Sequence, residues 1–274
     1  MTRLPLLPAD ALQNMALGIS ASESHDLDRL GLVEDHFHLA LGEIGRSILS
    51  SGGIIYYGGH LRPDGYTSLL VEELQRVGRR DSPLKICLSW SEHHLISSHD
   101  IFRQQDAMGL HADLILLSPE GEEVTVENRN DMHFDEAKAL SSLREYIVGK
   151  THVRVLLGGK RSGYNGVVPG VMEEALISIQ SGKPLFLAGG FGGATLDMIR
   201  VLRPEIANWC PEIEDEVAQN RAVLQEIKAT SELSGWTLES NGLSAEENAQ
   251  LAATYRPSEI ASLIGAGLAR LTSP

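Results

Sequence analysis

The stretch VRVLLGGKRSGYNGVVPGVMEEAL, residues 153–176, decides the fold class of this chain. It opens with an apolar run over 153–157 that stops at Gly158-Gly159, and helical apolar spacing begins at residue 171 and lasts to 180. A short buried strand, a glycine-rich loop and a helix in this order are typical of one unit of a parallel α/β sheet.

The same alternation recurs along the chain. Apolar runs predict further strands over 12–20, 53–57, 84–88, 113–117 and 185–188. Helical spacing predicts helices over 33–49, 66–77, 99–108, 134–148 and 194–202. Together these elements predict a Rossmann-like, doubly wound parallel sheet, a fold that binds ligands beyond the carboxyl ends of its strands.

The pattern changes after residue 204, where only helical spacing remains. Helices are predicted over 213–233 and 257–271, and a capping box at Ser244–Glu247 opens another helix between them. We therefore expect a sheet domain over 1–204 and a helical appendage over 205–274, packed on the sheet or on a second subunit.

Composition narrows the classes of partner. The chain has 274 residues, with Lys+Arg 23 against Asp+Glu 37 and a net charge of −14, which disfavours a duplex nucleic acid but not a small nucleotide held by local groups. Cys87 and Cys210 lie far apart, so neither a zinc ribbon nor a disulfide scaffold is expected. No apolar run is long enough for a membrane span, so we expect a cytoplasmic protein without a membrane partner.

Two strand ends lead into glycine-rich loops that suit a phosphate-bearing ligand. Glycine lets backbone N–H groups approach an anion, and the helix that follows adds its positive N-terminal dipole. Serines at the end of the first predicted strand are suited to bind phosphate or ribose, and a tyrosine in the second loop is suited to stack on a base. The candidate ligand contacts are Ser20, Ser22, Gly58, Gly59, His60, Arg62, Gly65, Gly158, Gly159, Lys160, Arg161, Tyr164, Gly166 and Gly170.

Other interpretations of these features remain. Each Gly-Gly pair alone could simply make a tight turn. Neither loop matches the dinucleotide fingerprint or the P-loop, so a conventional NAD dehydrogenase or NTPase is disfavoured and no cofactor is expected. The histidines at 93, 94, 99 and 111 match no standard zinc spacing, so we expect no metal and place His93 or His94 at the rim of the ligand site.

Several of these motifs resemble the SLOG superfamily, the Rossmann-like group that includes the lonely-guy phosphoribohydrolases, and among its subfamilies SLOG cluster 2. The blocks that carry the resemblance are Gly18–Ser22, Tyr57–Gly65, Leu143-Arg144, Leu157–Leu176, Gly182–Pro184 and Leu187–Gly193. The resemblance covers roughly residues 12–200 and implies a nucleotide-derived ligand, such as a nucleoside monophosphate or an ADP-ribose-like or NAD-like molecule, in a homo-oligomer.

By position, the resemblance makes Arg144 and Glu174 the candidate catalytic residues of an N-glycosidase. A carboxylate can stabilise the oxocarbenium-like ribose left when a base departs, and an arginine can fix phosphate or ribose oxygens. Three departures bear on this activity: Leu157 replaces a proline, the loop before the glutamates is longer, and no Gly-Thr precedes Glu174. The alternatives are a sensor that binds without turnover and signals through a separate effector protein, an N-glycosidase, and a non-catalytic oligomeric interaction module.

Overall fold

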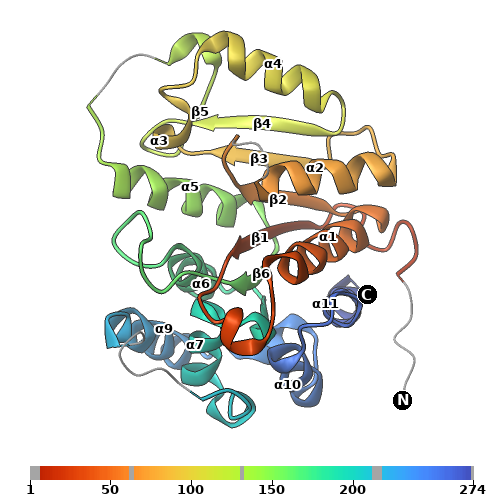
Figure 1. Ribbon diagram of the computed structural model, residues 1–274, viewed down its shortest axis with the longest axis vertical. Helices are drawn as coiled ribbons and strands as arrows, with labels where there is room; N and C mark the ends of the chain where they lie inside the picture. Colours follow the sequence, from red (N-terminus) through yellow and green to blue (C-terminus); the bar gives the residue numbers. More distant parts are fainter. Residues whose placement is uncertain (1–6, 62–64, 130–132, 212–217, 273–274) are drawn as a thin grey trace.

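The computed structural model describes residues 7–61, 65–129, 133–211 and 218–272. Its centre is a seven-stranded sheet in the order β5-β4-β3-β2-β1-β6-β7, parallel except for the pairing of β5 with β4. Figure 1 shows the strands stacked from β4 down to β6. The strands are β1 (Ala16–Ser22), β2 (Ile54–Gly58), β3 (Leu84–Leu88), β4 (Ala112–Leu117), β5 (Glu123–Val124), β6 (Val153–Gly158) and β7 (Leu185–Ala188).

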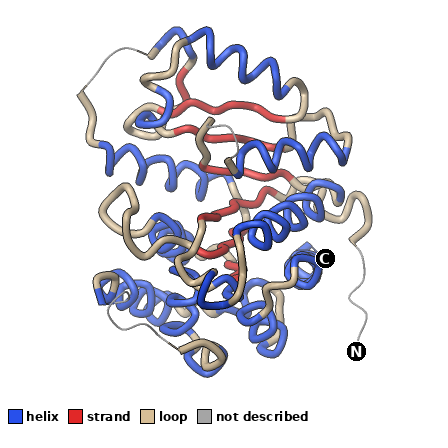
Figure 2. The backbone as a smooth tube through the Cα atoms, in the orientation of Figure 1, coloured by secondary structure: helices blue, strands red, loops and turns tan. Residues whose placement is uncertain are grey.

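Helices cover both faces of the sheet, as Figure 2 shows. Along the sheet domain they are α1 (Glu34–Ser50), α2 (Tyr66–Val77), α3 (Trp90–His93), α4 (Ser98–Met108), α5 (Glu136–Lys150), α6 (Gly170–Gln180) and α7 (Gly193–Leu202). Toward the C-terminus they are α9 (Arg221–Ser234), α10 (Ala245–Ala253) and α11 (Pro257–Thr272). The predicted Rossmann-like α/β class is confirmed.

Alternate residues of β6 face two separate cores. Val155 packs into the core that contains residues of α1, α2 and α11, whereas Leu156 packs into the core of α6, α7 and α9. Successive side chains of a strand point to opposite faces of the sheet. A strand that is covered on both faces therefore needs an apolar residue at nearly every position.

The chain changes direction across the sheet at β1 and β6. Strands β1 to β4 spread away from β1 on one side, and β6 and β7 extend on the other. The segments that leave the ends of β1 and β6 therefore diverge, which opens a crevice at the carboxyl ends of these two neighbouring strands.

The C-terminal helices share the packing of the sheet. Helix α11 packs on α1, α10 lies against β7, and α9 contacts α6 and α7. Ile260 and Leu263 of α11 belong to the same core as the strand residues Leu17 and Val155. The helical segment after residue 204 thus covers the sheet of its own chain, as one of the two predicted arrangements required.

The predicted elements differ from the observed ones mainly at their ends. The first strand begins at Ala16 rather than residue 12, because residues 9–14 form turns and Asn14 has a positive φ of 69°. It continues to Ser22, so both predicted serines lie in the strand itself. The sequence prediction missed β5 and the single turn α3, since both are too short to show a period. Part of the helix predicted over 213–233 lies outside the described residues.

Candidate functional site

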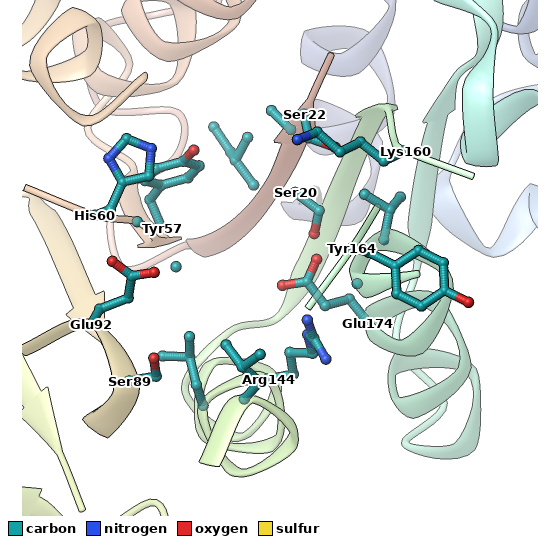
Figure 3. Close-up of a pocket in the computed structure, with 18 residues that line it drawn as sticks. Ser20, Ser22, Tyr57, His60, Ser89, Glu92, Arg144, Lys160, Tyr164 and Glu174 are labelled. Carbon is teal, nitrogen blue, oxygen red and sulfur yellow. The ribbon is translucent and has the colours of Figure 1, made fainter. Parts of the chain in front are cut away.

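A cavity of about 220 Å³ lies at the crevice beyond the carboxyl ends of β1, β2 and β6. Figure 3 shows Ser20, Arg144 and Glu174 gathered on one side of it, and Tyr57, His60 and Glu92 on another. Among the predicted site residues, those that line it are Ser20, Ser22, Gly58, Gly59, His60, Arg144, Lys160, Tyr164, Gly170 and Glu174. The structure thus brings together residues more than 150 positions apart in the chain.

Arg144 reaches the cavity from α5 and is ion-paired with Glu173, the residue before the candidate catalytic Glu174. Glu173 also accepts a hydrogen bond from Ser141. A Cβ on Gly170 would lie 2.8 Å from Nη2 of Arg144, so this glycine leaves room for the guanidinium. Arg144 is buried, because α5 turns its side chain toward Glu173 of α6.

Glu174 points into the cavity and is held by a residue that the sequence analysis did not select. Nη1 of Arg154, on β6, lies 2.9 Å from Oε1 of Glu174 and donates a 2.7 Å hydrogen bond to Oγ of Ser20. Arg154 is 1% exposed and lies under the floor of the cavity. A sequence signal existed, since a charged residue interrupts the apolar run VRVLL.

The beginning of α6 adds an anion-binding element to the same wall. Gly170 and Val171 line the cavity, and the residue before this 11-residue helix, Pro169, makes no side-chain cap. The N–H groups of Met172 and Glu173 donate to the Pro169 carbonyl oxygen. Lys160 and Ser22 lie close together at the edge of the cavity in Figure 3. A helix N-terminus with a lysine and hydroxyl groups beside it favours a bound anion.

The opposite wall is formed by β2 and by the segment after β3. Ser89 and Glu92 line it together with Tyr57 and His60, and the sequence analysis missed the first two and Tyr57. Ser89 directly follows β3, whose carboxyl end meets the same edge of the sheet as β1 and β2. Burial, and then the charge of Glu174, raise the pKa of the Tyr57 hydroxyl, which therefore stays a neutral donor.

Arg161 does not line the cavity, contrary to our expectation from its loop. It is 1% exposed, and its guanidinium lies between Asp26, at 2.8 Å, and Asp197, at 2.6 Å. The loop after β6 turns this side chain inward, because the two buried carboxylates require a counter-charge. We therefore leave Arg161 out of the ligand site.

The remaining predicted residues do not line the cavity or lie outside the described part. Gly158 and Gly159 have positive φ values of 65° and 104° and make the turn after β6, where a Cβ on Gly158 would lie 2.4 Å from the carbonyl oxygen of Ser22. Gly65 caps α2, and Gly166 lies against Arg144. Arg62 falls outside the described residues.

The histidines after β3 do not form the expected rim. His93 is fully buried, and its Nε2 lies 2.9 Å from the carbonyl oxygen of Leu117. Burial is the main cause that lowers its pKa, so it is neutral. Within the described ranges, no cluster of three or more His, Cys, Asp or Glu side chains is arranged to hold a metal ion.

The fold and the cavity define a class of protein, the Rossmann-like α/β proteins with a cavity at the switch between two central strands. More narrowly, the family model of SLOG cluster2 matches residues 11–251, and the chain belongs to this family. Membership of SLOG cluster2 indicates that the chain binds or processes a nucleotide-related small molecule. No curated protein matches the chain. Among the helices that the structure describes, none has the length and apolar character to cross a membrane.

Proposed function

We propose that the cavity binds a nucleotide-derived small molecule, such as a nucleoside monophosphate or an ADP-ribose-like compound, with its phosphate against α6. The observation that carries this proposal is that Arg144, Lys160 and the first residues of α6 all line this cavity. These groups come from three segments, and together they provide positive charge inside a chain whose net charge is −14.

Arg144 keeps donors for a ligand although it is paired. Nη1 of Arg144 donates a hydrogen bond to Glu173, and a guanidinium has five N–H donors in all. Lys160 adds a positively charged ammonium group on a flexible side chain. The Ser22 hydroxyl can donate a hydrogen bond to a phosphate oxygen. This arrangement suits a phosphate monoester or the pyrophosphate of an ADP-ribose-like molecule better than an uncharged nucleoside.

The opposite wall suits the base. Tyr57, Ser89 and Glu92 combine an aromatic edge, a hydroxyl and a carboxylate, which match the mixed donors and acceptors of a nucleobase. Tyr164 also lines the cavity, and its hydroxyl lies 3.5 Å from Oδ1 of Asn220.

Turnover is the second candidate, and the presence of both Arg144 and Glu174 in the cavity favours it. Glu174 would stabilise the ribose cation as the base leaves, and water would complete the hydrolysis. A sensing role would instead pass its signal to a separate effector protein, and we expect a homo-oligomer in either case.

A thermal-shift screen tests the proposal. We would screen AMP, other nucleoside monophosphates, ADP-ribose, cyclic ADP-ribose and NAD, with adenosine as the uncharged control, and analyse each sample for free base. A ligand at 100 times its Kd stabilises the fold by about 2.7 kcal/mol, which is readily detected.

The screen separates the candidates. A shift with phosphorylated compounds but not with adenosine, and intact ligand, supports binding without turnover. Released base supports hydrolysis, and Glu174→Gln should then abolish product formation while binding remains. The absence of a shift with every phosphorylated compound would contradict the proposal.

A further inference from the structure

Arg154 is an unusual residue for the middle of a buried strand. Its side chain is 1% exposed, and Nε and Nη2 lack a hydrogen-bond partner among the described residues. Two unsatisfied N–H groups on a buried cation cost free energy, so packing alone does not account for this arginine. Its remaining nitrogen, Nη1, makes both polar contacts, and both of these lead to residues that line the cavity.

Gly18 makes the position of Arg154 possible. The two residues are register partners on β1 and β6, and a Cβ on Gly18 would lie 3.1 Å from Cζ and Nη2 of Arg154. Gly18 is not in the left-handed region, so the backbone there does not require glycine. The space above Gly18 is instead filled by the flat guanidinium group.

The contacts of Arg154 set the hydrogen-bonding roles of two neighbours. Oε1 of Glu174 faces Arg154, whereas Oε2 has no donor among the described residues. This carboxylate can only accept a hydrogen bond from a ligand. Oγ of Ser20 already accepts from Arg154, so its own proton is free to be donated.

An acceptor beside a donor matches a hydroxyl group, which does both. A phosphate oxygen would meet the like charge of Glu174, whereas Arg144 and Lys160, which also line the cavity, attract it. We propose that Arg154 is a positioning residue that holds Glu174 and Ser20 as an adjacent acceptor and donor for the ribose hydroxyl groups of the ligand. This inference rests on the proposed function, because it assigns the sugar of that ligand.

The main test compares ribonucleotides with their 2′-deoxy counterparts. We would measure Kd by calorimetry for AMP, 2′-deoxy-AMP, UMP and 2′-deoxy-UMP with the wild type, Arg154→Met, Arg154→Lys and Gly18→Ala. The wild type should prefer the ribonucleotide by about 10- to 100-fold, the value of a hydrogen bond to a charged group. Arg154→Met and Gly18→Ala should reduce this ratio to about 2-fold, while Arg154→Lys should restore part of it.

The matched control is Arg200→Met, which removes another arginine that pairs with a buried carboxylate, that of Asp197, and does not line the cavity. It should keep the wild-type ratio. A ratio that is unchanged in Arg154→Met and Gly18→Ala, or lost equally in Arg200→Met, would overturn the proposal, since a purely structural role weakens both nucleotides alike.

A ligand-free experiment separates this inference from the proposed function. We would measure Tm for Arg154→Met, Glu174→Gln and the double variant. If Arg154 holds Glu174, the double variant should lose clearly less than the sum of the two single losses. Additive losses would overturn the positioning contact whatever the protein binds. Coupled losses together with no binding of AMP or UMP would keep the contact but overturn hydroxyl recognition.

Discussion

Two buried arginines lie a few residues apart in the chain and have opposite surroundings. Arg161 is enclosed with Asp26 and Asp197, and we call these three residues the Arg161 cluster. Arg154, with Ser20 and Glu174, forms what we call the Arg154 cluster. Both arginines are 1% exposed, yet only the second cluster borders the cavity.

The Arg161 cluster satisfies its charges within the protein. The guanidinium makes two hydrogen bonds to Asp197, and the N–H of Gly193 donates to Asp26 at 2.7 Å. Burial opposes the ionisation of Asp26, but the bonds from Arg161 and Gly193 outweigh it and lower the pKa of Asp26. This cluster joins the segment after β1 to the loop after β6 and to α7.

The Arg154 cluster leaves donors and acceptors open. Two nitrogens of Arg154 have no partner among the described residues, and Glu174 turns one oxygen to the cavity. A buried arginine therefore indicates a ligand site when its neighbours, like Glu174 and Ser20 beside Arg154, keep unused hydrogen-bonding groups that face a cavity. A fully paired arginine, even in a glycine-rich loop, stabilises the fold.

The largest effect is expected from Arg161→Met. It removes the cation that lies between two buried carboxylates and leaves Asp26 with Arg29 and Asp197 with Arg200. This should lower the free energy of unfolding by about 3 kcal/mol. Urea denaturation would measure this loss. Arg203→Met is the control: Arg203 is 26% exposed and pairs with Glu205 and Glu239, so it should cost about 1 kcal/mol or less. Equal losses in the two variants would contradict the assigned role of the Arg161 cluster.

The next effect is on binding rather than stability. Arg144→Met removes a charged donor from the cavity and should weaken AMP by about 10- to 100-fold. The Kd for adenosine should change much less, because adenosine lacks the phosphate. Calorimetry with both compounds measures the difference. An equal loss for AMP and adenosine would show that Arg144 acts through the packing of Glu173 and not through the phosphate.

Lys160→Ala should have a smaller effect in the same direction. Lysine contributes a point charge on a flexible side chain near the edge of the cavity, so we expect the Kd for AMP to rise by about 3- to 10-fold. A higher salt concentration should reduce the ratio of the Kd values of variant and wild type for AMP, because salt screens exposed charges. A ratio that does not respond to salt would argue against a direct phosphate contact.

The smallest effect is expected when the pH is lowered from 7 to 5, because the contribution of Asp26 in the Arg161 cluster to the free energy of unfolding should not change over this range. The pKa of Asp26 is lowered in the folded state, so its contribution is fully present above the unfolded aspartate value near 3.8 and is lost as the pH falls through the folded pKa. The difference in urea midpoint between wild type and Asp26→Asn should therefore stay constant from pH 7 to 5 and shrink below pH 4. A difference that shrinks between pH 7 and 5 would contradict this sign.

Much of the fold could be predicted from residue patterns. The apolar run at 153–157 and the helical spacing from residue 171 correspond to β6 and α6, because strand and helix periods are properties of neighbouring residues. Ser244 was predicted to open a helix, and its side chain accepts from the N–H of Glu247 in a capping box. The domain boundary at residue 204 stays a prediction.

The candidate site was predicted less completely. Ser20 and Lys160 were selected because glycine-rich turns and strand ends mark the edge of a parallel sheet, and Glu174 because of the resemblance to the SLOG superfamily. The ion pairs were not predicted: the resemblance named Arg144 and Glu174 as candidate catalytic residues, and the structure pairs Arg144 with Glu173 and Arg154 with Glu174. Which of two adjacent glutamates meets which arginine depends on helix rotation and sheet register.

The sequence by itself determined the order of strands and helices and the edge of the sheet where polar loops collect, because these follow from local periodicity and from glycine at the strand ends. Only the tertiary structure decided that Arg161 is enclosed by Asp26 and Asp197 while Arg154 lies beneath the cavity. The physical reason is that a charged side chain is stabilised by the partners that surround it in space, and one of these, Asp26, lies 135 positions before Arg161 in the chain.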